Sequence, residues 1–319
     1  MDVSVKSKHG LGCFFSKKVL LFVSLLFMVV LVFSPFISVV NGWEVVDVYV
    51  YSEDGLRDAI SAAPDNTYYR IFIGKELVIE KPLEIPEGKL IYLGSIGRLV
   101  GANGADTIIV KSGGMLSLWD GIVVTHADGD SGRGVYVEHG GTLELFGGGE
   151  ISGNTINGRG GGVYNEGTFD MYWEINARDG KIYGNTATEG GGVYNVGTFT
   201  MYGGVISENI CVDTETSIGV GGGVYNAGTF SVSDGYISSN MATRGGGVYN
   251  AGSFVVTEGY IVRGNTAISG EGDDVFVDDS SVRAFYLLAI VITVVIVGVV
   301  AGLFFWCSKK QKHLVTKSS

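Results

Sequence analysis

The sequence predicts an all-β protein, a right-handed parallel β-helix of about seven coils. Three observations predict this fold. The hexapeptide GGGVYN occurs four times, beginning at Gly160, Gly190, Gly221 and Gly245. The copies lie within a longer repeat of 24 to 31 residues, which contains three short apolar stretches of alternating polarity separated by Gly, Asn, Thr and Asp. Such stretches are typical of short strands between tight bends, and repeats of this kind are typical of stacked β-helix coils.

Three positions of the repeat are apolar or aromatic in nearly every copy, so we expect each to form a column along the stack. The tyrosine of GGGVYN belongs to the column Ile109, Tyr136, Tyr164, Tyr194, Tyr225, Tyr249 and Phe276. A second column is Leu116, Leu143, Phe169, Phe199, Phe230 and Phe254. A third is Val124, Ile151, Ile182, Ile206, Ile237 and Ile261. Asparagine follows most of the third column by three residues, at Asn154, Asn185, Asn209 and Asn240, whereas Asn265 comes one residue late.

The VYN tripeptide predicts which side chains point inward. Val and Asn lie two residues apart and therefore share one face of a strand, while Tyr occupies the other. In the outer coils Val replaces the Asn, so we expect this face to be the interior and the Tyr to point outward. Asn also tolerates the left-handed backbone of a bend. We therefore expect an internal ladder of side-chain amides at Asn165, Asn195, Asn226 and Asn250.

Both ends of the stack have a predicted closure. An N-terminal cap is expected over residues 43–81, with a strand at 43–51 and an amphipathic helix at 52–64. The β-helix is expected over 82–283. Near its end, GDDVFVDDSS (272–281) keeps the strand pattern but has Asp in place of Gly, which blunts the exposed strand edge with charge.

Two apolar runs lie outside the repeats. Residues 284–307 carry no charge and are long enough for a membrane-spanning helix, so we expect a lipid membrane as partner there. Residues 308–319 form a basic tail, and 1–18 form a basic region before the apolar run 19–42. That run is either a cleaved signal peptide or an uncleaved anchor. The middle of the chain has 32 acidic and 14 basic side chains. Because basic flanks stay in the cytoplasm, we expect a cell-membrane protein, single- or double-pass, with this middle part as an ectodomain outside the cell.

Composition excludes several classes of partner. An acidic ectodomain lacks the basic patch that neutralises phosphates, so we expect no nucleic-acid binding. In GGGVYN the glycines precede a strand and no Lys follows, which excludes a nucleotide-binding loop. Cys211 is the ectodomain's single cysteine, so no internal disulfide joins its coils.

The repeat carries a family resemblance. The run IYGNTATEGGGVY (182–194) resembles the repeats of chlamydial polymorphic outer membrane proteins and of adhesin-like β-helix proteins. Residues 53–95 resemble the first coil of pectin-lyase-like right-handed β-helices. Together the resemblance covers about residues 50–280. It implies surface adhesion or display.

Two acidic segments are candidates for chemistry. Asp128, Asp130 and Arg133 lie within THADGDSGR (125–133), where the two aspartates partly resemble a calcium loop and the arginine suggests a polysaccharide lyase. The alternative is a solvated acidic bend. Asp170 and Glu174 lie beside Tyr172 and Trp173, an arrangement suited to a glycosidase. The alternative is a loop without catalytic function. No cofactor other than calcium is expected.

The outward tyrosines are the candidate ligand-binding residues: Tyr136, Tyr164, Tyr194, Tyr225 and Tyr249. Such rings bind sugars or protein partners, or else shield the strand backbone. The sequence therefore favours a membrane-anchored, adhesin-like surface protein that binds a carbohydrate or protein ligand without catalysis. The alternatives are an anchored polysaccharide lyase or glycoside hydrolase, and a structural spacer of the cell envelope.

Overall fold

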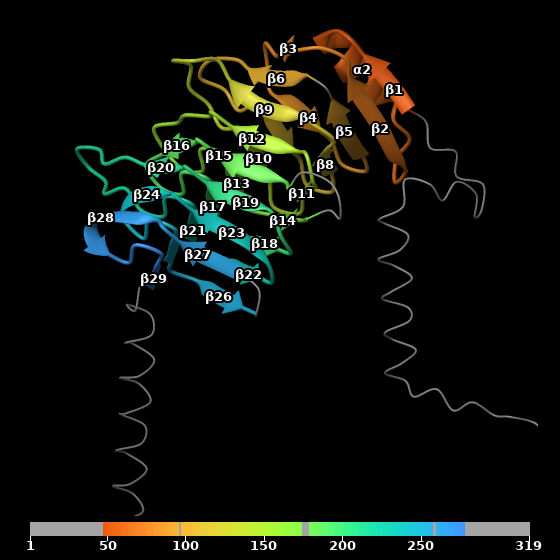
Figure 1. The fold of residues 1–319 in the computed structure, drawn as a ribbon. Helices are drawn as coiled ribbons and strands as arrows, with labels where there is room; N and C mark the ends of the chain where they lie inside the picture. Colours follow the sequence, from red (N-terminus) through yellow and green to blue (C-terminus); the bar gives the residue numbers. More distant parts are fainter. Residues whose placement is uncertain (1–46, 96, 174–178, 258–259, 278–319) are drawn as a thin grey trace, which may run out of the picture. The chain divides into compact units, whose positions relative to one another are not determined.

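The computed structural model describes residues 47–95, 97–173, 179–257 and 260–277. They form a parallel β-solenoid, in which successive coils lie side by side in sequence order (Figure 1). Two sheets of eight strands each receive one strand per coil, so there are about eight coils. The prediction of seven was wrong by one. The additional coil contains Leu83–Ile85, which pairs with Ile108–Val110 but lacks the glycines of the later repeats.

The strands form four sheets, and the strands of each sheet are given below in the order of the coils. Sheet A contains β1 (Asp47–Val50), β2 (Tyr68–Ile73), β5 (Leu90–Ser95), β8 (Met115–Trp119), β11 (Thr142–Leu145), β14 (Thr168–Met171), β18 (Thr198–Met201), β22 (Thr229–Val232) and β26 (Ser253–Val256). Sheet B contains β3 (Leu77–Val78), β6 (Arg98–Gly101), β9 (Val123–His126), β12 (Glu150–Ser152), β15 (Lys181–Tyr183), β19 (Val205–Ser207), β23 (Gly235–Ser238) and β27 (Tyr260–Arg263). Sheet C contains β4 (Leu83–Ile85), β7 (Ile108–Val110), β10 (Val135–Val137), β13 (Val163–Asn165), β17 (Val193–Asn195), β21 (Val224–Asn226), β25 (Val248–Asn250) and β29 (Val275–Val277). Sheet D contains β16 (Thr186–Ala187), β20 (Ile210–Cys211), β24 (Met241–Arg244) and β28 (Thr266–Glu271).

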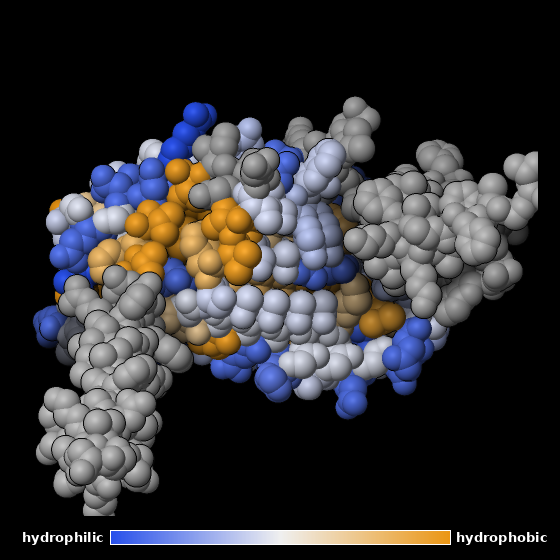
Figure 2. All heavy atoms as spheres, turned by 90° about the horizontal axis from the view of Figure 1, so that it is seen from below, coloured by the Kyte–Doolittle hydropathy of each residue, from blue (hydrophilic) through white to orange (hydrophobic). Residues whose placement is uncertain are grey.

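The register confirms the first two predicted columns in full. Tyrosines of neighbouring coils pair directly in sheet C, as do the Leu and Phe residues of the second column in sheet A. Figure 2 shows rows of similar side chains of intermediate hydropathy along one face, with hydrophobic side chains gathered near one end. The third column is wrong at its end, because Ile237 pairs with Val262 and not with Ile261. Asn265 therefore follows its column by three residues, like the other asparagines.

The interior is filled by stacked copies of the same side chains. Phe169, Phe199 and Phe230 are fully buried, and their ring centroids lie 4.5 and 4.6 Å apart with nearly parallel planes. Burial of one such side chain stabilises the fold by about 2 to 3 kcal/mol. Stacking in register repeats this contribution from coil to coil, and Cys211, the one cysteine within the described ranges, is a free thiol.

Two ladders of buried asparagine amides run through the stack. In the first, Nδ2 of Asn165 donates to Oδ1 of Asn195 at 2.7 Å, and the pattern continues to Asn226 and Asn250. The second was not predicted as a ladder. Its amides donate in the same way, each to the next, through Asn154, Asn185, Asn209, Asn240 and Asn265. It ends on the carboxylate of Asp274. Because each amide donates to the next, the asparagines can be buried with most of their hydrogen bonds made, although Oδ1 of Asn165, at the start of the first ladder, has no partner among the described residues.

The three glycines of GGGVYN have two different roles. Gly190 has φ +64°, a left-handed backbone that glycine adopts without strain. Gly191 and Gly192 instead leave room for the neighbouring coil, since a Cβ at either would lie 2.6 Å from a carbonyl oxygen of that coil. The motif is therefore a bend followed by a close contact between backbones.

The predicted helix at 52–64 is present as α2 (Glu53–Ala62). Ser52 caps it, because its Oγ accepts a hydrogen bond from the Gly55 N–H at 3.1 Å. Leu56 and Ile60 of α2 are buried and belong to the same core as the strands. Strand pairing already begins with β1 and β2, so the sheets start within the segment predicted to be only a cap.

Within the described ranges no helix is long and apolar enough to span a membrane. The predicted runs 19–42 and 284–307 lie outside those ranges, as do the basic segments 1–18 and 308–319.

Candidate functional site

The tyrosine column (Tyr136, Tyr164, Tyr194, Tyr225 and Tyr249) forms a continuous aromatic stack on the outer side of sheet C. From Tyr164 onward the ring centroids lie 4.7 to 5.3 Å apart and the planes are within 16° of parallel. Tyr136 meets Tyr164 edge to face, at 74°. Because the rings cover one another, they present edges and not faces to the exterior, and Tyr194 is only 5% exposed. A sugar ring therefore cannot lie flat on an individual tyrosine in the middle of the column.

Two arginines lie over one end of this column. The Arg133 guanidinium carbon is 5.1 Å from the Tyr164 ring centroid, and that of Arg159 is 5.0 Å from the Tyr194 centroid. The Tyr136 hydroxyl donates to Oε2 of Glu166 at 2.9 Å. Burial and this acceptor raise the pKa of Tyr136 to about 12, so the hydroxyl keeps its proton. Arg133, Arg159, Glu166, Tyr136, Tyr164 and Gly158 line a depression of about 490 Å³, called the arginine pocket below.

The segment THADGDSGR does not form one cluster. Asp128 is exposed and Asp130 half-exposed, whereas Arg133 donates to the Asp106 carboxylate at 3.2 Å. His126 is buried, with Nδ1 2.8 Å from Oδ1 of Asn154 and Nε2 2.9 Å from the Ala105 carbonyl oxygen. Among the residues that the structure describes, no group of three or more His, Cys, Asp or Glu side chains is placed to hold a metal ion. Calcium binding by Asp128 and Asp130 therefore stays a prediction without a preformed site in this part of the chain.

A second candidate site lies on the outer face of sheet A. One outward position of that sheet is polar in successive coils and forms the polar column Tyr92, Ser117, Glu144, Asp170, Thr200 and Ser231. The Ser117 hydroxyl donates to Oε2 of Glu144 at 2.7 Å. Burial raises the pKa of both Glu144 and Asp170, and the neighbouring charge of Asp170 raises that of Glu144 further. The two carboxyl groups thus form a pair that resists ionisation.

Aromatic side chains flank the polar column. Tyr172 stacks between Phe146 and Tyr202, with centroid distances of 4.7 and 5.1 Å. The position equivalent to Tyr202 in the next coil is Ser233. The Ser233 N–H donates to the Met201 carbonyl oxygen, just as the Tyr202 N–H donates to the Met171 carbonyl oxygen. Tyr202 is consequently 43% exposed.

Trp173 extends the same surface. Its side chain packs over Gly203, where an added Cβ would lie 2.6 Å from the Trp173 Cβ, and it is 47% exposed. We call the polar column, with Tyr172, Trp173 and Tyr202, the sheet A stripe. Its aromatic rings offer open surface that the tyrosine column lacks.

The structure changes the predicted carboxylate pair. Glu174, the expected partner of Asp170, lies outside the described residues. Instead, Glu144 of β11 is the register partner of Asp170 of the adjacent strand β14, so the two residues lie next to each other on neighbouring coils. Sequence reasoning missed Glu144 because it searched within one loop. The signal was present, however, since LEL (143–145) and FDM (169–171) occupy the same position of consecutive repeats.

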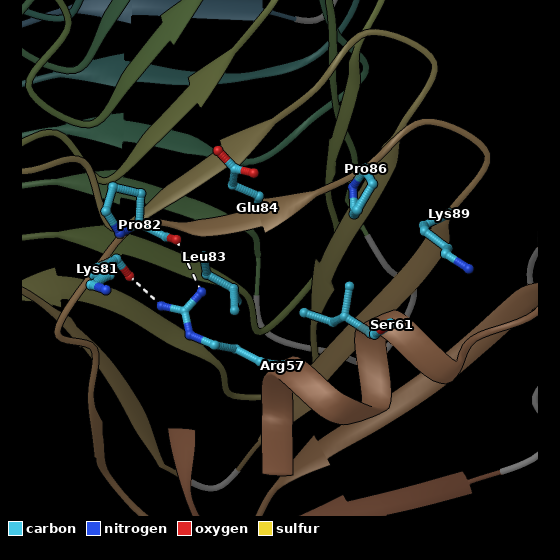
Figure 3. A pocket seen from close by; sticks show the side chains of 9 residues that line it. Arg57, Ser61, Lys81, Pro82, Leu83, Glu84, Pro86 and Lys89 are labelled. Atoms are coloured by element: carbon cyan, nitrogen blue, oxygen red, sulfur yellow. Dashed lines mark hydrogen bonds between the residues drawn. The ribbon is translucent and has the colours of Figure 1, made fainter. Parts of the chain in front are cut away.

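Another depression, of about 740 Å³, lies between α2 and β4. Figure 3 shows Arg57 reaching from α2 to the carbonyl oxygens of Lys81 and Pro82, which accept its hydrogen bonds at 2.5 and 3.1 Å. Lys89 is likewise held by Asp65 and by the Ala63 carbonyl. These cations fasten the helix to the first coil, so they have less capacity for a ligand than the arginines of the arginine pocket.

Comparisons with protein-family models, curated proteins and solved structures find no match to this chain. The structure shows a parallel β-solenoid fold.

Proposed function

We propose that this protein is an adhesin-like, membrane-anchored surface protein that binds a neutral glycan chain along the sheet A stripe without catalysis. The observation that carries the proposal is the exposure of Tyr202 and Trp173 directly beside a column of hydroxyl and carboxyl side chains. The resemblance of the repeats to adhesin-like β-helix proteins supports it.

The chemistry of the stripe suits a sugar. A pyranose ring presents apolar C–H groups on its face and hydroxyl groups at its rim. Exposed aromatic rings contact such a face, while carboxyl and hydroxyl groups hydrogen-bond the rim. A polyanion beside Glu144 and Asp170 would disfavour their ionised forms further, and burial already disfavours those forms, so binding it would cost free energy. A neutral glycan therefore fits better than a polyuronate.

The repeated geometry suits an extended ligand. Each coil adds one outward threonine or serine to the row Thr142, Thr168, Thr198, Thr229 and Ser253, and one residue to the polar column beside it. Coils are about 4.8 Å apart. A chain lying along the stack would meet similar groups repeatedly, and many weak contacts then sum to useful avidity.

The membrane anchor and the outward orientation rest on sequence features. The uncharged run 284–307, the basic segments at both ends and the acidic middle support display outside the cell.

Glycoside hydrolysis is the second candidate function. Two adjacent carboxyl groups with raised pKa are the arrangement in which one group holds a proton as acid while the other acts as base or nucleophile. The same stripe would then bind and cleave its glycan.

The test uses the purified full-length protein with a panel of neutral polysaccharides and polygalacturonate. Tyr202→Ala and Trp173→Ala are each expected to weaken neutral-glycan binding about tenfold or more, the range of an interface hot spot. Tyr236→Ala is the matched control, because Tyr236 is 45% exposed but lies in sheet B. Equal affinity of all three variants and the wild type would contradict the proposed site.

Polymer length distinguishes the two functions. Binding without release of reducing ends supports the adhesin. Shortening of the polymer that disappears in Glu144→Gln and Asp170→Asn would instead establish the hydrolase. Binding to no glycan or protein would leave the spacer.

A further inference from the structure

We propose that the arginine pocket is a second binding site, separate from the sheet A stripe, and that its ligand is an acidic sugar residue, a uronic or sialic acid. In this proposal Arg133 and Arg159 bind the carboxylate of the sugar and Glu166 accepts a hydrogen bond from one of its hydroxyls. The pocket lies on sheet C and its adjoining bends, so the inference does not depend on the proposed function.

The Arg133 guanidinium is fixed by hydrogen bonds at Nε and Nη1, whereas its Nη2 is left for a ligand. Its Nη1 donates to Asp106 and its Nε donates to the Arg159 carbonyl oxygen at 2.9 Å. The guanidinium carbon lies 5.1 Å from the ring centroid of Tyr164 and 5.9 Å from that of Tyr136. Within the described ranges Nη2 makes no hydrogen bond. The hydrogen bonds and ring contacts of Arg133 fix the orientation of its guanidinium group before a ligand binds. This lowers the entropy cost of binding.

Arg159 presents more of its guanidinium to solvent. Only its Nε is engaged, by Oε2 of Glu189 at 2.9 Å, and 52% of the side chain is exposed. Its two Nη groups make no hydrogen bond to the described residues. Two Nη donors in one plane match the two oxygens of a carboxylate, a bidentate contact that lysine cannot make.

Glu166 restricts the ligand further. It accepts from Tyr136 and interacts with the Tyr164 hydroxyl as well, and a carboxylate has about four acceptor positions, so capacity for another donor remains. A simple anion such as acetate has no hydroxyl to donate, so it would meet the repulsion of Glu166 without a compensating hydrogen bond. A neutral sugar would leave the arginine donors unused. A sugar acid supplies both an anion and hydroxyl donors on one rigid ring.

Charge balance argues for directional recognition. Asp106, Glu189 and Glu166 surround the two arginines, so acidic side chains outnumber basic ones by three to two and the pocket has no excess positive charge. A dianion such as sulfate or phosphate is thereby disfavoured. Hydrogen-bond geometry, and not net attraction, would select the ligand.

The repeat provides a matched control for Arg159. The bridges that pass along this bend pair Arg159 with Glu189, Glu189 with Val220 and Val220 with Arg244, so Arg244 occupies the same position three coils on. Arg244 also pairs through Nε with a glutamate, Glu271, at 2.6 Å. It does not line the arginine pocket.

The experiment measures binding of glucuronate, galacturonate and N-acetylneuraminate to the full-length protein by ligand-observed NMR, with glucose and acetate for comparison. At least one sugar acid should bind ten or more times tighter than glucose and acetate. Arg159→Gln should weaken that binding at least tenfold, and Arg244→Gln should not change it. Glu166→Gln should reduce the preference for the sugar acid over acetate.

Two results would overturn the proposal. One is that no sugar acid binds more tightly than acetate. The other is that Arg159→Gln and Arg244→Gln have the same effect. Circular dichroism of each variant controls for folding. Because Tyr202→Ala should leave sugar-acid binding intact, failure of this site and failure of the sheet A stripe are distinguished.

Discussion

Asn185 and Asn209 join two successive coils through a single oxygen atom. Oδ1 of Asn209 accepts hydrogen bonds from both Nδ2 and the backbone N–H of Asn185, at 2.9 and 3.0 Å. Both side chains are fully buried. The same double contact recurs between Asn209 and Asn240. The ladder therefore satisfies backbone and side-chain donors together at a bend where no strand pairing does so.

Replacing Asn209 with Ala should destabilise the protein by about 2 to 5 kcal/mol, because it leaves two donors of Asn185 without their acceptor and removes the side-chain donor to the Ile182 carbonyl. Chemical denaturation of the full-length chain measures the change. Asn103→Ala is the control, since Asn103 is exposed and bonds Ser131 at the surface, and it should cost less than about 1 kcal/mol. Similar losses for the two variants would contradict the structural importance of the ladder.

Gly192→Ala should be poorly tolerated although its φ lies outside the left-handed region. The added methyl would lie 2.6 Å from the Gly223 carbonyl oxygen and 3.0 Å from Nδ2 of Asn209, so two coils would have to separate. We expect the free energy of unfolding to fall by about 1 to 3 kcal/mol or more, as in overpacked cores, or the protein to fail to fold. Gly158→Ala provides the comparison, because its nearest neighbour, Cγ1 of Ile156, lies 3.8 Å away. Melting temperatures of the two variants within a degree of each other would refute this account of the glycine triplet.

Stability should fall as pH rises through the titration of Glu144 and Asp170. Burial raises their pKa in the folded state above the ordinary values of about 4.3 and 3.9, so in that range the fold binds more protons than the unfolded chain. The penalty is absent below these ordinary values and complete once the pH exceeds the folded ones. Glu144→Gln and Asp170→Asn should remove it and be more stable than wild type at pH 7.

Denaturation at a series of pH values from 4 to 8 checks this difference. Asp128→Asn, at an exposed position, should follow the wild-type profile. If the Glu144 and Asp170 variants were instead less stable than wild type at pH 7, the carboxylates would have ionic partners that stabilise their charge.

Cys211 should be unreactive in the folded protein. Burial raises the pKa of its thiol to about 12, and Sγ accepts from the Gly191 N–H at 3.1 Å. Reaction requires the thiolate, which is scarce at pH 8 under these conditions. In a Cys13→Ser, Cys307→Ser background, a thiol reagent should label Cys211 only after denaturant is added. Rapid labelling of the native protein would show that sheet D opens.

The repeat columns could be read from sequence because each coil places the same residue in the same environment. Tyr164 and Tyr194 are 30 residues apart, yet one position in the motif predicts their pairing. The error at Ile261 has a local cause, since the connection from Val256 to Tyr260 is one residue longer than the connection from Val232 to Gly235 in the preceding coil, and the asparagine ladder follows the shifted register.

The sequence by itself determined the β-solenoid and the inward direction of Val and Asn, because periodicity and composition are local properties of the chain. The amide ladder of Asn165, Asn195, Asn226 and Asn250 followed from the repeat, but tertiary structure alone decided which other polar groups meet. Glu144 lies next to Asp170 on the neighbouring strand, Arg133 forms an ion pair with Asp106, and the tyrosine rings stack on one another. Those outcomes depend on side-chain direction and on contacts between coils, which a pattern of residue types does not specify.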